Sequence, residues 1–311
     1  MNKKVADFKE GEHLEMPLLV AGLTKGTTNS GAPYLSLILQ DDSKDIEAKI
    51  WDVKPEIAKE MEVGKVFEFE FDVIKYRQNL QLKIAKVLPL IQSEINKSDF
   101  IFKSPIKKDE LRSALSEAIN RIKNPIIAKI TVAVLNEYGE AFYEYPAASK
   151  IHHSFIGGLA THVKGMLEIA KAITEIYPQV DYDYLCAGII LHDLGKIEEL
   201  SSPIVTEYTT KGKLLGHISI LHAKLTEVID DLKLSEAKEA LILRHMVLAH
   251  HGQLEFGSPV RPMTLEAELL YLIDNIDARI NTITKALDQI KEGEFTPKLF
   301  ALENRSFYKH D

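Results

Sequence analysis

The chain has 311 residues, 45% of them hydrophobic and 27% charged, with a formal net charge of -8. This composition is ordinary for a globular protein long enough for two domains, and the negative charge argues against nonspecific coating of nucleic acid. The single cysteine, Cys186, excludes an intrachain disulfide and a multi-cysteine zinc site. No run approaches the ~18 apolar residues of a membrane span, and the charged start is no signal peptide. We therefore expect a cytoplasmic protein that does not contact membranes.

The first 90 residues have the alternating pattern of β-strands. In "KVFEFEFDV", phenylalanines alternate with acidic residues. Leucine, isoleucine or alanine recurs at every second position in "PYLSLILQD", "DIEAKIWD" and "NLQLKIAKV". The stretch "LEMPLLVAGLT" adds a fifth strand, and "KPEIAKEME" predicts a short helix between the third and fourth strands. Five strands with a helix at that point indicate a small OB-type barrel over residues 1–90.

Residues 91–110 have no steady period, so we interpret them as a linker, and the stretch from residue 91 to residue 129 has an excess of basic side chains. From residue 111 to residue 311 the hydrophobic periodicity is helical, in segments separated by glycine and proline. The predicted fold class is thus multidomain, an all-β barrel followed by an all-α domain.

Histidines are concentrated in the predicted helical domain, with nine of the eleven between residues 152 and 251. Each has an ordinary structural explanation, because an isolated inward histidine is more often a hydrogen-bonded core residue than a ligand. As a group they would be costly to bury without partners. A metal cluster removes that cost with nitrogen and oxygen ligands and no thiolate. The groups that the helical pattern directs inward, or that follow apolar helices, are His162, His192, Asp193, His217, His250, His251 and Asp274.

The order of these motifs resembles a known family. His162, the adjacent pair His192-Asp193 and the late Asp274 are similar to the HD-domain metal-dependent phosphohydrolases, and "HDLGK" and "AHHG" to the subgroup with two metals. The segment "GAPYLSLILQDDSKDIEAKIWD" resembles a nucleic-acid-binding OB domain. With "HHSFIGGLATH" and "FGSPVRPMTLEAELLYLIDNIDARI", the chain resembles the YhaM family of bacterial 3′–5′ exoribonucleases over nearly its whole length.

The resemblance implies a ligand set. His162, His192, Asp193 and Asp274 would hold a first divalent cation, and Asp193 would bridge to a second held by His217, His250 and His251. Two cations ~3.5–4 Å apart can activate a hydroxide and neutralise phosphate oxygens. Manganese is the family expectation, although the donor set alone also admits iron, cobalt or nickel.

Further residues near these motifs are candidates for contact with substrate. Lys196, one turn beyond His192, would stabilise the scissile phosphate, or else it is a solvated lysine at a helix end. His153, or its neighbour His152, could approach the substrate or protonate the leaving oxygen, with a structural role as the alternative. Ser258 and Arg261 in "GSPVR" could contact phosphate, or this segment could be only a turn that connects two helices.

The outward positions of the barrel strands offer a second candidate surface. Tyr34 and Lys83 have this parity, and Tyr76 and Arg77 lie near Lys83 at a turn. Aromatic side chains beside basic groups can stack single-stranded bases. Trp51 has the outward parity too, but we expect it in the core, because a bulge at the strand end would turn it inward and tryptophan is usually largely buried.

These observations predict a metal-dependent 3′–5′ exoribonuclease. It would hydrolyse single-stranded RNA to nucleoside 5′-monophosphates through hydroxide activated at a two-metal HD site, with Asp193 and Lys196 in the reaction. Single-stranded DNA is a second candidate substrate, and we expect a homo-oligomer. The alternatives are a phosphohydrolase of nucleotides or cyclic dinucleotides, and a nonenzymatic RNA-binding scaffold.

Overall fold

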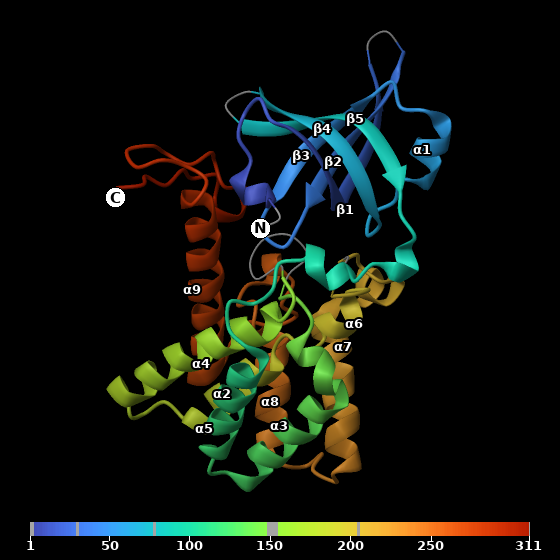
Figure 1. The fold of residues 1–311 in the computed structure, drawn as a ribbon. Helices are drawn as coiled ribbons and strands as arrows, with labels where there is room; N and C mark the ends of the chain where they lie inside the picture. Colours follow the sequence, from blue (N-terminus) through green and yellow to red (C-terminus); the bar gives the residue numbers. More distant parts are fainter. Residues whose placement is uncertain (1–2, 29–30, 77–78, 148–154, 204–205, 311) are drawn as a thin grey trace. The chain divides into compact units, whose positions relative to one another are not determined.

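The computed structural model describes residues 3–28, 31–76, 79–147, 155–203 and 206–310. They form two compact units, Met1–Lys103 and Ser104–Asp311 (Figure 1). The division falls inside the segment 91–110 that the sequence indicates as a linker. That segment contains two short 3-10 turns and the start of the first helix of the second unit.

The first unit is a closed barrel of five strands in the described residues. The strands and the short helix are β1 His13–Thr27, β2 Pro33–Gln40, β3 Asp45–Trp51, α1 Pro55–Glu60, β4 Val66–Tyr76 and β5 Asn79–Pro89. Their order around the barrel is β1-β2-β3-β5-β4, with β3 and β5 parallel and the other neighbours antiparallel. This order, with the helix between β3 and β4, is the Greek-key arrangement of an OB fold, which confirms the predicted barrel.

Strand alternation separates the inside of the barrel from its outside. Phe67, Phe69, Phe71 and Val73 of β4 are buried, whereas the acidic residues between them point outward. The strand β1 closes the barrel, because it pairs with β4 along its first half and with β2 along its second half. A register shift between Val20 and Gly22 bends it from one neighbour to the other.

The expectation that Trp51 lies in the core is wrong. The pairing of β2 with β3 runs without a bulge from Gln40 opposite Asp45 to Tyr34 opposite Trp51. Trp51 therefore keeps the outward parity of its strand, and 51% of it is exposed.

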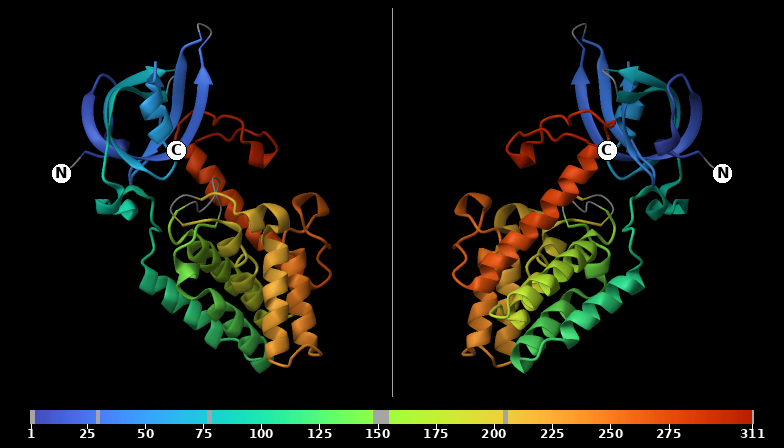
Figure 2. Two further views of the ribbon diagram at one scale, coloured as in Figure 1. Left: turned by 90° about the vertical axis from the view of Figure 1, so that its right-hand side faces the viewer. Right: turned by 90° about the vertical axis from the view of Figure 1, so that its left-hand side faces the viewer.

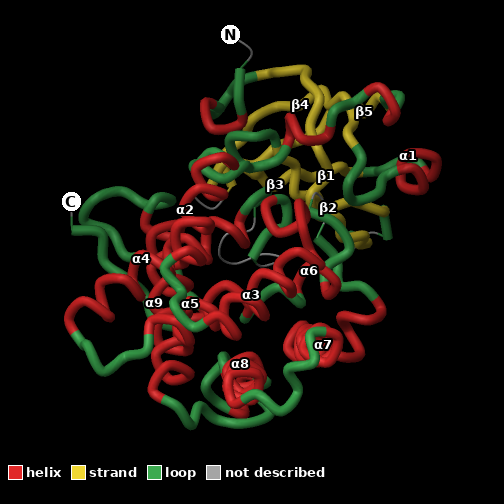
Figure 3. Tube along the Cα trace, turned by 90° about the horizontal axis from the view of Figure 1, so that it is seen from below, coloured by secondary structure: helices red, strands yellow, loops and turns green. Residues whose placement is uncertain are grey.

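The second unit is helical (Figures 2 and 3). Its helices are α2 Lys108–Asn120, α3 Pro125–Tyr138, α4 Gly158–Ile176, α5 Tyr182–Leu191, α6 Lys196–Glu199, α7 Thr210–Asp231, α8 Lys238–Ala249 and α9 Leu265–Leu287. Figure 3 looks nearly along α7 and α8, which pack side by side. None of the described helices combines the length and the apolar composition that crossing a bilayer requires.

The helix α5 is the centre of this unit. Every residue from Tyr184 to Leu191 is buried, and α2, α3, α4, α8 and α9 all pack against it. A helix that is apolar on all sides belongs in a core. Its last turn delivers His192 and Asp193 into the middle of the bundle, where both are buried.

Candidate metal centre

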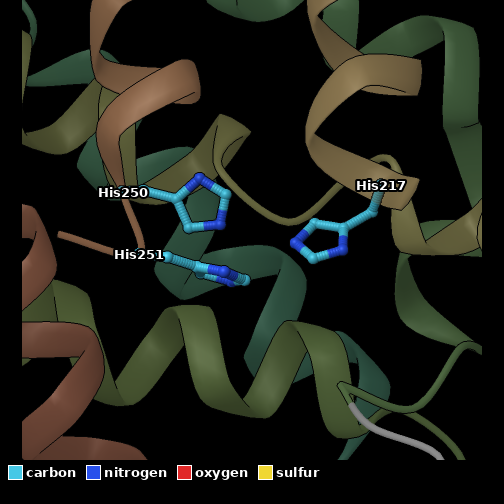
Figure 4. A group of neighbouring side chains, drawn as sticks. All are labelled: His217, His250 and His251. Atoms are coloured by element: carbon cyan, nitrogen blue, oxygen red, sulfur yellow. The ribbon is translucent and has the colours of Figure 1, made fainter. Parts of the chain in front are cut away.

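Two groups of potential metal ligands meet inside the helical unit. The first consists of His162, His192 and Asp193, and the second of His217, His250 and His251. Within each group the ligand atoms lie within 4.8 Å of one another. Figure 4 shows the three imidazoles of the second group facing one another across a common space. We call these sets the first group and the second group.

The ligands come from helices far apart in the sequence. His162 lies in the second turn of α4, His192 and Asp193 follow α5, and His250 and His251 follow α8. His217 lies within α7, directly after a kink at Gly216, whose φ of 69° is left-handed. Because the kink interrupts the helical hydrogen bonds, the backbone N–H of His217 donates to Glu199 Oε1 instead, at 3.0 Å.

The carboxylate of Asp193 lies between the two groups. Its Oδ2 is 3.2 Å from His192 Nε2, in the first group. Its Oδ1 is 3.5 Å from His217 Nε2 and 3.8 Å from His250 Nε2, in the second group. Each oxygen of this one side chain therefore faces a different group.

All five ligand imidazoles use Nδ1 for a protein contact. His192, His250 and His251 donate from Nδ1 to the carbonyl oxygens of Ile189, Val247 and Phe256 at 2.7 to 2.8 Å. A carbonyl only accepts, so these rings carry their proton on Nδ1 and present a bare Nε2 to the site. His162 and His217 place Nδ1 against the carboxylates of Asp277 and Glu199.

The atoms that face the centre fit divalent cations. Among the described residues, Nε2 of His192, His217 and His250 and Oδ1 of Asp193 are buried without a hydrogen-bond partner. Burying lone pairs against one another is costly. Cations bound among these nitrogens and oxygens would remove that cost, and the donor set is one that manganese, iron, cobalt, nickel or zinc accepts.

Asp274 joins the first group from the side of α9. Its Oδ1 lies 3.2 Å from His162 Nε2, while Asp277, one turn further along α9, contacts Nδ1 of the same ring at 2.6 Å. Burial lowers the pKa of His162, but the two carboxylates outweigh burial and raise it to about 9. His162 is thus held between two acidic side chains of one helix.

Opposing charges keep Asp193 ionised. Burial favours its neutral form, but opposing charge, that of Lys196 above all, outweighs burial and holds the pKa of Asp193 well below its usual range. In the second group, burial and the neighbouring His251 lower the pKa of His250. A neutral imidazole beside an ionised carboxylate is the protonation state that metal binding needs.

Glycine explains part of the "HDLGK" motif. Gly195 has an ordinary helical φ of -61°. A Cβ at this position would lie 2.2 Å from the carbonyl oxygen of His217. Gly212 is similar, because its Cβ would lie 2.3 Å from the carbonyl oxygen of Glu199. Both glycines let α6 and α7 approach closely enough to bring His217 to Asp193.

The remaining predicted residues have different settings. Lys196 is nearly buried, and its Nζ lies 2.6 Å from Asp193 Oδ2. Ser258 is buried, and its Oγ has no hydrogen-bond partner among the described residues, whereas Arg261 is exposed. His152, His153 and Arg77 lie outside the described residues. His222 and His245, outside the predicted ligand set, bond to Arg244 and to the backbone N–H of Met263.

Sequence reasoning missed the two carboxylates behind the ligands, Asp277 and Glu199. Asp277 follows Asp274 by three residues, which places both on one face of α9. That spacing was an available signal. Glu199 lies in the acidic end of "HDLGKIEEL", where nothing in the sequence distinguishes it from Glu198.

The barrel carries an aromatic and basic outer surface on β2 and β3. The rings of Tyr34 and Trp51 are 5.3 Å apart, and Lys49 Nζ lies 5.0 Å from the centre of the Tyr34 ring. Lys83 of β5 is opposite Lys49 and is exposed. Tyr76 is also exposed, at the end of β4. We call Tyr34, Lys49 and Trp51 the aromatic platform; OB folds bind oligomers with this β2–β3 face.

Residues 159–279 match the HD domain family. The helical unit is an HD domain. The matched range includes both ligand groups and Asp274. The HD domain with these His and Asp clusters is that of a metal-dependent phosphohydrolase.

The barrel has a similar counterpart among solved structures. It is similar to the second OB-fold domain of replication protein A from Methanococcus maripaludis, with 20% sequence identity and a TM-score of 0.24. That match covers 29% of this chain and 95% of the other. The assignment of the OB fold here follows from the strand order of the barrel itself.

Proposed function

We propose that the protein is a metal-dependent 3′–5′ exoribonuclease that releases nucleoside 5′-monophosphates from single-stranded RNA. The observation that carries the proposal is the convergence of five Nε2 atoms and the two oxygens of Asp193 in an HD domain of the same chain as an OB barrel. The cluster of metal ligands in the HD domain supports phosphodiester chemistry. The OB barrel supports a polymeric, single-stranded substrate.

Residues of the two groups would hold two divalent cations. His162, His192, Asp193 and Asp274 would bind one cation, and Asp193, His217, His250 and His251 the other; manganese is the metal we propose. Cations so placed would supply Lewis acidity toward the phosphate and activate water for attack. The leaving group would be the 3′-oxygen of the penultimate nucleotide.

The protein itself contributes charge and orientation around that chemistry. Lys196 is a fixed cation beside Asp193, where it would stabilise charge that develops on the phosphate. The buried Oγ of Ser258 and the exposed guanidinium of Arg261 are the further proposed phosphate contacts. His153 remains a proposed proton donor to the leaving oxygen.

The barrel would bind the polymer upstream of the reacting end. Stacking of a base on Tyr34 or Trp51 is worth about 1–3 kcal/mol and does not depend strongly on the base. Lys49 and Lys83 would neutralise phosphates beside the platform, and Tyr76 and Arg77 would extend the contact near the end of β4. Binding through stacking tolerates DNA, so single-stranded DNA is a second proposed substrate.

The products of a 5′-labelled RNA test the proposal directly. With manganese, a 5′-labelled single strand should give a ladder that shortens from the 3′ end, with nucleoside 5′-monophosphates as the unlabelled product. Mononucleotides and cyclic dinucleotides serve as competing substrates. Their faster turnover would favour a nucleotide phosphohydrolase, and binding of the RNA without any cleavage would favour a scaffold.

A further inference from the structure

Two carboxylates outside the ligand set support one imidazole in each group. Asp277 Oδ2 lies 2.6 Å from His162 Nδ1, in the first group. Glu199 Oε1 lies 3.2 Å from His217 Nδ1, in the second group, and also accepts the backbone N–H of His217. Both ligand rings are buried or nearly so. Among the described residues, each group therefore has one imidazole whose Nδ1 is held by a carboxylate.

The other three imidazoles are supported differently. His192, His250 and His251 donate to backbone carbonyls, which no side-chain substitution removes. A carboxylate makes a stronger, charge-assisted hydrogen bond than a carbonyl and increases the basicity of the ring that donates to it. His162 and His217 are therefore the two imidazole ligands whose strength as electron donors to a cation depends on a side chain, that of Asp277 or Glu199.

We propose that Asp277 and Glu199 are positioning residues, each of which sets the affinity of one cation. Asp277 would act on the first group through His162, and Glu199 on the second group through His217. The inference rests on the two-cation part of the proposed function and is independent of the RNA substrate. It predicts that the affinity for each cation can be lowered separately, although Asp193 would contact both cations.

A glycine on α4 makes room for Asp277. Gly165 follows His162 by three residues, so both lie on the face of α4 toward α9. A Cβ at Gly165 would lie 2.8 Å from Asp277 Oδ1. The short carboxylate would have to move, and its hydrogen bond to His162 would be displaced. Gly165→Ala should therefore weaken cation binding at the first group, although alanine favours a helix more than glycine does.

Manganese titration of the full-length, chelator-treated protein tests the inference. Calorimetry should resolve two binding events in the wild type. Asp277→Asn and Glu199→Gln keep the size of each side chain and remove its charge, and each should weaken one event by about 10- to 100-fold while the other stays within a factor of about three. The double variant should weaken both.

Crystals soaked at limiting manganese assign the weakened event to a group. Anomalous scattering should remain at the second group in Asp277→Asn and Gly165→Ala, and at the first group in Glu199→Gln. Two matched controls lack an imidazole ligand as partner. Glu198→Gln changes the neighbouring carboxylate, which contacts Tyr138 and Lys211, and Glu268→Gln changes an exposed carboxylate of α9. Both controls should bind manganese like the wild type.

The outcomes separate this inference from the proposed function. A wild-type protein that binds fewer than two cations would contradict the two-cation site itself. Wild-type affinities in Asp277→Asn and Glu199→Gln, or the loss of both events together in each single variant, would overturn the separate roles proposed here. Circular dichroism and thermal melting in chelator identify a variant that fails to fold, in which case Gly165→Ala decides for the first group.

Discussion

Lys196 Nζ lies 2.6 Å from Asp193 Oδ2, the carboxylate oxygen that faces His192. The lysine is nearly buried, and although burial lowers its pKa, Asp193 outweighs burial and raises it. A permanent positive charge is therefore fixed at the edge of the first ligand group. Removing this charge would change the electrostatic surroundings of Asp193 without removing a proposed metal ligand.

Replacing Lys196 should separate hydrolysis from metal binding. In Lys196→Met we expect kcat to fall by on the order of 10²–10³-fold, because a preorganised charge is lost from the transition state. Manganese stoichiometry should stay at the wild-type value. Single-turnover cleavage of 5′-labelled RNA and a manganese titration measure the two effects. Unchanged kcat would show that Lys196 only balances the charge of Asp193.

Trp51 should report directly on binding of a single strand. It is the only tryptophan, and it is half-exposed on the aromatic platform, so stacking of a base should quench its fluorescence. Trp51→Ala and Tyr34→Ala should each weaken binding of a long oligonucleotide by about 1–3 kcal/mol. Hydrolysis of a small activated phosphodiester should not change.

The matched control for the platform is Tyr177→Ala, an exposed tyrosine at the end of α4. It should bind the oligonucleotide like the wild type. If RNA leaves the Trp51 emission unchanged, or if the platform variants lose hydrolysis of the small ester to the same extent as RNA binding, the platform is not the RNA-binding surface.

The space at Gly195 should be essential for the second group. Gly195→Ala brings a methyl group against the backbone of His217, and we expect a loss of about 1–3 kcal/mol in unfolding free energy together with weaker metal binding. Urea denaturation in chelator measures the first effect. Gly188→Ala is the comparison, because its methyl group would meet the flexible end of Met246 instead. Equal effects of the two substitutions would contradict this explanation of the motif.

Metal-free stability and metal affinity should depend on pH in opposite directions. His162 has a pKa raised from 6.5 to about 9. Its ion pairs with Asp274 and Asp277 therefore stabilise the metal-free fold fully below pH 6.5, and this contribution disappears as the pH rises to about 9. Manganese affinity should increase over the same range, because a cation needs the unprotonated Nε2.

Melting temperatures in chelator at pH 6, 7.5 and 9 measure this dependence, with His162→Gln as the reference that lacks the titrating group. The wild type should lose more stability than the variant between pH 6 and pH 9. Parallel pH profiles would contradict the raised pKa of His162.

The sequence allowed prediction of features that follow from local periodicity. The alternation in β4 correctly predicted which phenylalanines are buried, and the helical pattern correctly predicted that His162 points inward. The ligand set was predicted from inward histidines and from the order of the HD motifs. These signals need no knowledge of which helices pack together.

Contacts between elements that are distant in the sequence could not be predicted from local periodicity. Nothing local to Glu199 indicates that a kink at Gly216 will bring the N–H and Nδ1 of His217 to its carboxylate. Trp51 was misplaced because a general preference for burial was given more weight than strand parity, and the unbroken β2–β3 register decided for parity. In both cases the deciding information is the position of a neighbouring element.

Anomalous diffraction from crystals of the full-length protein saturated with manganese tests the central claim most directly. The account predicts two manganese peaks about 3.5–4 Å apart. One should contact His162, His192 and Asp274, the other His217, His250 and His251, and Asp193 should contact both. Crystals of Asp193→Ala, collected in the same way, should show neither peak at full occupancy. Absence of manganese from this cluster in the saturated wild type, or full occupancy of both positions in Asp193→Ala, would contradict the account.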